Sequence, residues 1–332
     1  MKPSLFRTVF TGADGLRAGW SLLIFFVLMA ALSRGMHVFL DHRHLTSLSG
    51  TPISVGLFFF LQSSGVLMIL LVTWTMSKIE RRPIPVYGLG SGSALPNFLS
   101  GLACGAACLS LLVFALWKDR LLAFDGRLLS GAPVLGYGAI WIIGFLLLGV
   151  FEEYLNRGYV FFTISRGLTG VYGWLFKTRH NNALGFWTAS LILSILFGLG
   201  HLRNPGESPI GSLCAGLFGV AMCLSLWRTG SLWLAIGFHA SWDWAESFVF
   251  GVADSGLMIE HHLLATHPLG NPLMSGGATG PEGSLFALPI LAVATLIIIF
   301  AFPRAQSVYA RSDRPSGSAE MASTIDGSPT RS

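Results

Sequence analysis

Long apolar runs recur along the chain, and short polar or glycine-rich stretches separate them. Each run is close to the roughly 20 residues that an α-helix needs to cross about 30 Å of hydrocarbon. Eight spans can be placed in this way, with centres near Leu28, Leu67, Cys108, Ile143, Leu193, Phe218, His239 and Ala294. The pattern predicts an all-α fold, a polytopic membrane protein of about eight transmembrane helices.

Composition agrees with a membrane protein. Hydrophobic residues make up 52% of the chain and charged residues 11%, whereas charged residues make up roughly 25% of an ordinary soluble domain. The first apolar run, 20–32, follows a long amino-terminal stretch and has no small-residue cleavage site after it, so we expect a membrane span and not a signal peptide. The four cysteines lie in apolar spans, which is typical of small core residues and not of a disulfide framework or a zinc set.

Breaks between the spans divide the chain. The 78–93 stretch contains Pro83 and Pro85 followed by glycines, which end a helix. The end of the chain is poor in apolar residues and rich in Ser, Thr, Gly and Pro, so we expect it to be disordered. The predicted parts are 1–133 with three transmembrane helices and their loops, 134–250 as a helical core, 251–284 as a glycine-rich external loop, 285–304 as the last transmembrane helix, and 305–332 as a cytoplasmic tail.

The basic residues indicate an orientation. With the amino terminus in the cytoplasm, inner segments hold most of the 21 Lys and Arg residues, as the positive-inside rule requires. Both termini are then cytoplasmic, and the external loop 251–284 has no Lys or Arg. Because the basic residues flank loops and form no stripe, we expect no nucleic-acid partner. We expect a bacterial inner membrane as the location.

Three polar clusters interrupt the apolar spans. They contain Glu152, Glu153 and Arg157 in the first, Phe197 and His201 in the second, and His239 and Asp243 in the third. In each cluster the paired residues are four apart, so they share one helix face. Separate charges facing lipid cost roughly 2.5 to 3.5 kcal/mol each. We therefore expect the three faces to meet in one polar intramembrane pocket.

Hydrolysis by an activated water is the chemistry that suits two carboxylates and two imidazoles. A buried glutamate or a bound metal can deprotonate water while other donors stabilise an oxyanion. Ser241 lies on another helix face than His239, and H-E-x-x-H is missing, so neither a serine mechanism nor a standard zincin is expected. More ordinary roles stay open: Arg157 as a structural partner of a glutamate, Asp243 as a residue that orients His239, Phe197 as packing, and Glu246 as a weaker site candidate.

With these motifs the sequence resembles the CPBP family of intramembrane proteases, the CAAX prenyl protease and abortive-infection family. That family carries EExxxR, FxxxH and HxxxN or HxxxD in this order, and the three polar clusters match them over about 134–250. The resemblance implies a glutamic-type or metal-dependent endopeptidase that cleaves a membrane-associated, in some relatives prenylated, protein or peptide.

By this resemblance Glu152 and His201 activate water, while His239 and Asp243 bind the oxyanion. Alternatively Glu152, His201, His239 and Asp243 hold a divalent metal such as zinc. Glu153 and Arg157 support the arrangement. Asp243 stands where many relatives have Asn; an ionised carboxylate cannot donate a hydrogen bond, so a protonated Asp or a metal ligand is then implied.

Two further points stay open at this level. With simple span ends, Glu152, His201 and His239 differ in depth by more than about 10 Å. Either the fourth helix begins later and runs past Arg157, or the fifth is displaced inward, as Pro205 and a polar loop at 166–182 would allow. The histidines of the external loop, His261, His262 and His267, are expected to be solvated and not to bind metal. A transporter or ion relay, and an inactive scaffold or immunity protein, are the rival functions.

Overall fold

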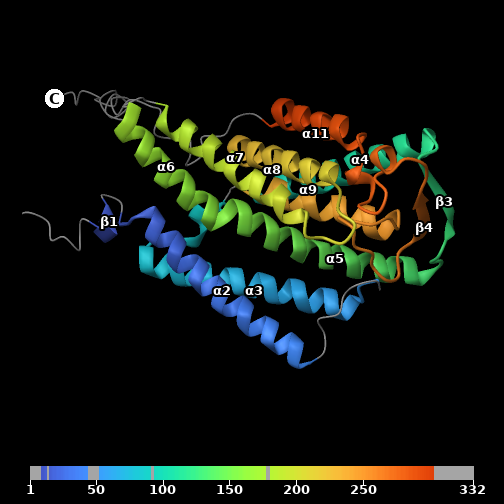
Figure 1. Ribbon diagram of the computed structural model, residues 1–332, viewed down its shortest axis with the longest axis horizontal. Coiled ribbons are helices and arrows are strands. Elements are labelled where there is room, and N and C mark those ends of the chain that lie inside the picture. Colours follow the sequence, from blue (N-terminus) through green and yellow to red (C-terminus); the bar gives the residue numbers. More distant parts are fainter. Residues whose placement is uncertain (1–8, 13–14, 44–51, 91–92, 177–179, 303–332) are drawn as a thin grey trace, which may run out of the picture.

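Apolar helices form most of the protein in a computed structural model that describes residues 9–12, 15–43, 52–90, 93–176 and 180–302. The long helices run side by side as an elongated bundle (Figure 1). Their bounds are α2 Ala18–His42, α3 Val55–Glu80, α4 Ala94–Lys118, α5 Ala132–Tyr154, α6 Val160–Phe176, α7 Asn181–His201, α8 Pro209–Thr229, α9 Trp233–Trp244 and α11 Ala287–Ala301. The predicted helical membrane fold is confirmed.

Six of the described helical segments are long and apolar enough to cross a membrane. The continuous segment formed by α5 and α6 counts as one of the six. The last apolar helix, α11, has 15 residues and is shorter than a full span. Helix α9 has 12 residues and continues into the π-helical turn η3, Ala245–Val249. The spans that we centred near His239 and Ala294 are therefore helices, but short ones.

Helix α5 does not end where the sequence indicated. It continues through a π-helical turn, η2 (Leu155–Tyr159), into α6, so that Ala132–Phe176 forms one helical segment of 45 residues. At 1.5 Å per residue this segment is about 68 Å long, and Glu152 lies near its middle. The expected polar loop at 166–182 is wrong, because most of that stretch belongs to α6. Of our first solution to the depth problem, the helix that runs past Arg157 is confirmed, but its later start is wrong, because α5 already begins at Ala132.

Short strands tie the loops together at the ends of the bundle. Strand β3 (Leu122–Arg127) pairs antiparallel with β4 (Leu264–Pro268), and β1 (Thr11–Gly12) pairs with β2 (Gly15–Leu16). These two pairs lie at opposite ends of the molecule in Figure 1. The glycine-rich loop 251–284 thus contains regular structure, namely β4, α10 (Pro272–Ser275) and the 3-10 turn η4 (Pro281–Gly283). The predicted tail, 305–332, lies outside the described residues.

Glycines bring α4 and α9 into close contact. A Cβ atom on Gly101 would lie 2.3 Å from the Leu234 carbonyl oxygen, and one on Gly105 would lie 2.2 Å from that of Phe238. On the other helix, a Cβ on Gly237 would lie 2.3 Å from the Phe98 carbonyl oxygen. Small residues four apart are the usual way in which membrane helices approach this closely. The contact fixes α9, which carries the third polar motif, against the bundle.

Candidate active site

Glu152 and Glu153 lie at the end of α5, just before the helix widens. In the turn η2 the residue Gly158 leaves helical geometry, with φ −88° and ψ −116°. The Asn156 side-chain amide donates to the Glu152 carbonyl oxygen (2.9 Å), a group that the wide turn exposes. Helix α9 likewise passes into the π-helical turn η3 two residues after Asp243. Single π turns inside α-helices are frequent at functional sites.

Glu153 holds the two motifs together. It is fully buried, and its Oε1 atom accepts hydrogen bonds from Arg157 Nη1 (2.6 Å) and His239 Nδ1 (2.9 Å). Arg157 is also buried, and its Nε atom donates to the Gly219 carbonyl oxygen of α8 (3.4 Å). The structural role that we considered for Arg157, which is to fix a glutamate by a charge-assisted bond, is the one that its contacts show.

His239 presents its other nitrogen to two acids. Its Nε2 atom lies 3.8 Å from Glu152 Oε2 and 3.6 Å from Asp243 Oδ2. Because Nδ1 donates to Glu153, it is Glu153 and not Asp243 that orients the imidazole from behind. Separations of 3.6 to 3.8 Å are longer than a direct hydrogen bond, and a water molecule can bridge such groups.

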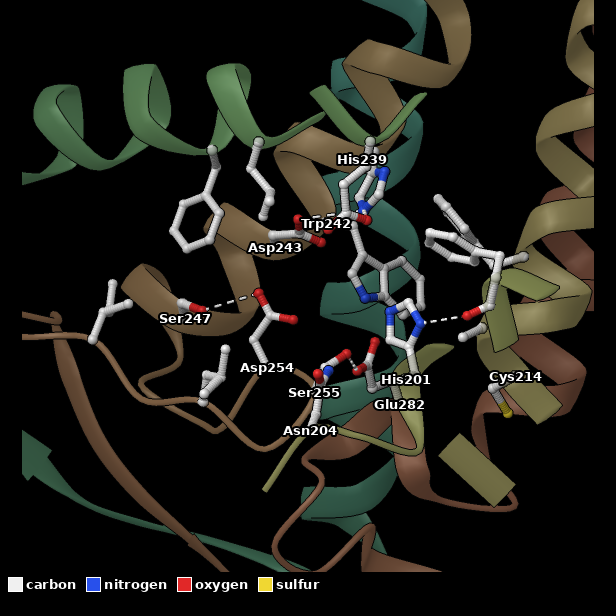
Figure 2. Close-up of a pocket in the computed structure, with 18 of the residues that line it drawn as sticks. His201, Asn204, Cys214, His239, Trp242, Asp243, Ser247, Asp254, Ser255 and Glu282 are labelled. Carbon is white, nitrogen blue, oxygen red and sulfur yellow. Dashed lines mark hydrogen bonds and ion pairs between the residues drawn. The ribbon is translucent and has the colours of Figure 1, made fainter. Parts of the chain in front are cut away.

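His201 ends α7 and enters the same pocket (Figure 2). Its Nδ1 atom lies 2.8 Å from the Phe197 carbonyl oxygen. A carbonyl oxygen can only accept, so Nδ1 carries the proton and a neutral ring has its free lone pair on Nε2. The Phe197 ring lies 4.5 Å from the His201 ring and 5.3 Å from the Arg157 guanidinium carbon, between the motifs. Phe197 therefore packs, as considered, but against the charged residues of the site.

These side chains line one pocket of about 270 Å³. The predicted residues in its wall are Glu152, Phe197, His201, His239 and Asp243. Glu153 and Arg157 lie behind the wall. Apolar residues of α3, α5, α8 and α11 complete the surface, among them Phe58, Leu148, Phe218 and Leu291. The three polar faces thus meet at one cavity that combines an apolar lining with a few polar groups, as small-molecule and peptide sites do.

The four residues considered for zinc do not form a ligand set as they are placed. The described residues contain one set of three acidic, His or Cys side chains whose ligand atoms all lie within 4.8 Å of one another. This set consists of Glu246, Asp254 and Glu282. Among the described residues, the ring nitrogens of His201 do not belong to such a set of three ligand atoms.

The histidines of the loop 251–284 are dispersed. The His261 ring stacks on Tyr137 (4.2 Å), His262 Nδ1 contacts the Leu264 carbonyl oxygen (2.7 Å), and His267 Nδ1 contacts Asp125 Oδ2 (2.8 Å). Each has a different neighbour, so the three share no metal site. Ser241 lies on the α4 side of α9, as its helix position indicated, and its hydroxyl donates to the Phe238 carbonyl oxygen (3.2 Å).

Several pocket residues were not expected from the sequence. Asp254 and Glu282 reach the wall from the loop 251–284, Asn204 follows α7, and Gln62 comes from α3. Burial, followed by the nearby carboxylates of Asp243 and Glu282, raises the pKa of Asp254 well above its ordinary value. Gln62 stands out as an amide in an apolar run, a signal that could have been read. An acid in a glycine-rich loop carries no such signal, because most loop acids are solvated.

Comparison with known proteins gives one match. Residues 134–245 match the family model described as type II CAAX prenyl endopeptidase Rce1-like. That segment begins at the start of α5 and ends just after Asp243, so it contains all three motifs. No curated protein matches the chain. The protein is thus a polytopic helical membrane protein, and its segment 134–245 is similar to the Rce1-like type II CAAX prenyl endopeptidases, which is consistent with the CPBP family that its motifs resemble.

Proposed function

We propose that this protein is an intramembrane endopeptidase that hydrolyses a peptide bond of a membrane-associated protein or peptide with a water activated by Glu152. Family membership supports membrane protease activity in general. The observation that carries the finer proposal is the shared pocket, in which Glu152 lies 3.8 Å from His239 while Glu153 holds that imidazole from the buried side.

Each polar residue of the site has a different role in the proposed reaction. The Glu152 carboxylate takes a proton from water as the water oxygen bonds to the scissile carbonyl carbon. His201 Nε2 accepts the water's other hydrogen and orients it. His239, protonated and held through Nδ1 by Glu153, donates from Nε2 to the oxyanion, with the Asp243 carboxylate beside it. The proton on Glu152 then passes to the amide nitrogen, the C–N bond breaks, and an amine and a carboxylic acid leave.

Cleavage of membrane-tethered or prenylated peptides by the purified protein tests the proposal. We expect Glu152→Gln and His201→Ala to lower cleavage by about 10² to 10⁴ fold, the usual contribution of a general acid or base. Asp119→Asn, an exposed acid at the end of α4, is the matched control and keeps wild-type activity. Equal cleavage by wild type and both variants would refute the assignment and favour a transporter, relay or scaffold.

Zinc at the catalytic motifs is the alternative that needs its own experiment. Metal analysis of the purified protein, together with cleavage after treatment with a zinc-selective chelator, separates the two mechanisms. Glutamate-activated water predicts full activity after chelation and no stoichiometric zinc. Activity lost on chelation and regained with zinc would replace the Glu152 base with a metal-bound water.

A further inference from the structure

Three carboxylates converge beside the catalytic pocket but outside the family motifs. They are Glu246 from η3, Asp254 from the loop that follows, and Glu282 from η4, and their ligand oxygens lie within 4.8 Å of one another. Asp254 and Glu282 line the pocket, and Figure 2 shows both below Asp243 with their serine partners. Segments about 30 residues apart in the chain therefore place their carboxylates close together.

Glu246 has an unused buried oxygen. Its side chain is fully buried, and its Oε2 atom accepts a hydrogen bond from Trp242 Nε1 (2.9 Å). Its Oε1 atom is buried without a hydrogen-bond partner of good geometry, although the Glu282 backbone N–H lies near this carboxylate. A buried carboxylate oxygen without a partner is costly, so native structures normally supply a hydrogen bond or a cation. This orphaned oxygen, at the cluster, points to a ligand.

Nearby groups do not balance the negative charge. Ser247 donates to Asp254 Oδ2 (3.3 Å), and Ser255 donates to Glu282 Oε1, but hydroxyls are neutral. In the described part of the chain, no Lys or Arg lines the pocket, and no basic side chain lies within ion-pair distance of the three acids. Like charges this close repel strongly in a buried setting unless a cation lies between them or protons neutralise them.

The backbone holds the acids in place. A Cβ atom on Gly280, where φ is +112°, would lie 1.9 Å from the Ala253 carbonyl oxygen and 3.3 Å from Glu246 Oε1. The Gly256 N–H donates to the Thr279 carbonyl oxygen (2.9 Å), and the Val252 N–H donates to that of Glu246 (3.2 Å). With the two loop segments pressed together and onto η3, the carboxylates cannot separate without opening the loop.

We propose that Glu246, Asp254 and Glu282 bind a hard divalent cation, with Ca²⁺ as the preferred ion, which fastens the 251–284 loop to the end of α9–η3. The donor set is all oxygen, with carboxylates, serine hydroxyls and a carbonyl close together, which suits Ca²⁺ or Mg²⁺ and not zinc. The ligands come from a loop and from short turns, so their arrangement is irregular. Irregular ligands favour Ca²⁺, whose coordination is flexible, over Mg²⁺, which requires a near-ideal octahedron. The cation would shape one wall of the catalytic pocket, but its binding does not depend on the proposed protease function.

Thermal unfolding and calcium titration of the full-length protein in detergent, after removal of metals with EDTA, test this site. We expect one Ca²⁺ per chain and a midpoint temperature that rises with the logarithm of Ca²⁺ concentration, because the ion binds the folded state. We expect Glu282→Gln and Asp254→Asn to weaken Ca²⁺ binding by about tenfold or more, since affinity follows the number of charged ligands. Without Ca²⁺, both variants should be at least as stable as the wild type, because each removes one repelling charge.

Two controls separate this proposal from the catalytic one. Asp119→Asn removes an exposed acid on the same side of the bundle, and Glu152→Gln removes the proposed catalytic base; both should keep the wild-type calcium response. The result that overturns the site is a wild-type protein without saturable Ca²⁺ binding, or cluster variants that bind Ca²⁺ as tightly as the wild type. In the first case protons, and not a cation, hold the three acids together. If Glu282→Gln cannot be purified, Asp254→Asn and the wild-type titration still decide.

Discussion

Glu152 and Glu153 are neighbours in the chain but lie in different surroundings. Consecutive residues of an α-helix point about 100° apart. The Glu153 side chain is therefore fully buried between Arg157 and His239, whereas the Glu152 side chain is 27% exposed and faces the pocket. The inner glutamate positions the imidazole, and the outer one is available for water and substrate.

Removing the inner charge should cost stability. In Glu153→Gln the buried Arg157 guanidinium loses its counter-ion, and breaking a buried pair in this way typically costs about 3 to 5 kcal/mol. We expect a markedly lower unfolding midpoint in detergent. Cleavage should fall as well, because His239 loses the acceptor that holds its Nδ1.

An exposed pair provides the comparison for this variant. His37 and Asp41 are also four residues apart on a helix, with side chains 58% and 52% exposed. Asp41→Asn should change stability by less than about 1 kcal/mol, as exposed ion pairs do. A Glu153→Gln protein as stable as Asp41→Asn would show that the buried pair does not hold the site together.

At the scale of helices, close packing sets where the third motif lies. Gly101 and Gly105 let α4 touch the backbone of α9, and a Cβ on Gly149 of α5 would lie 3.2 Å from the Ile236 carbonyl oxygen on another side of α9. Helix α9, with its 12 residues, is thus held between two long helices at positions where glycines let backbone contact backbone. His239 reaches Glu153 because all three backbones lie this close.

A methyl group at this contact should therefore disturb the site from a distance. Gly105→Ala places a Cβ 2.2 Å from the Phe238 carbonyl oxygen, next to His239. Overpacking of this kind costs roughly 1 to 3 kcal/mol, which exceeds the gain of about 1 kcal/mol from the better helix propensity of Ala. We expect a lower unfolding midpoint and reduced cleavage.

Gly136→Ala is the matched control on α5. A Cβ on Gly136 meets no atom within 4 Å, so the variant should be neutral or slightly more stable. If Gly105→Ala were as stable and as active as Gly136→Ala, the close α4–α9 contact would not determine the position of His239.

The whole molecule places the pocket beneath the loop 251–284. Residues of that loop, including Asp254, Leu257 and Glu282, form part of the pocket wall. The β3–β4 pair and an isolated bridge between Ile53 and Ile259 tie the loop to the ends of neighbouring helices. With both termini in the cytoplasm, as we propose, this covered side of the pocket faces the exterior.

Cysteine labelling in intact cells tests this orientation. Asp125→Cys in β3 and Lys78→Cys near the end of α3 place exposed thiols at opposite ends of the bundle, whereas three of the native cysteines are buried and the fourth is partly so. A membrane-impermeant maleimide should label Asp125→Cys in intact cells and Lys78→Cys after permeabilisation. The reverse pattern would place both termini outside.

The sequence alone determined the helical membrane class, the three motifs and the face that each motif presents. These properties are local: they depend on apolar run length and on the 3.6-residue period, which act within one helix. Separation in sequence does not reveal depth, so the continuation of α5 into α6 was left as one of two solutions, and the 166–182 loop was placed wrongly. The π turn within this continuation contains Gly158, whose backbone leaves helical geometry, and a periodic pattern does not encode such a local departure.

Tertiary structure decided which polar groups meet. Glu153 and His239 are 86 residues apart, and their contact exists because glycines let α4, α5 and α9 approach one another. The division of roles between Glu152 and Glu153, and the contribution of Asp254 and Glu282 to the pocket wall, follow from the same long-range packing. A sequence pattern specifies the direction of a side chain relative to its own helix, but the charge and burial around it come from the elements packed against that helix.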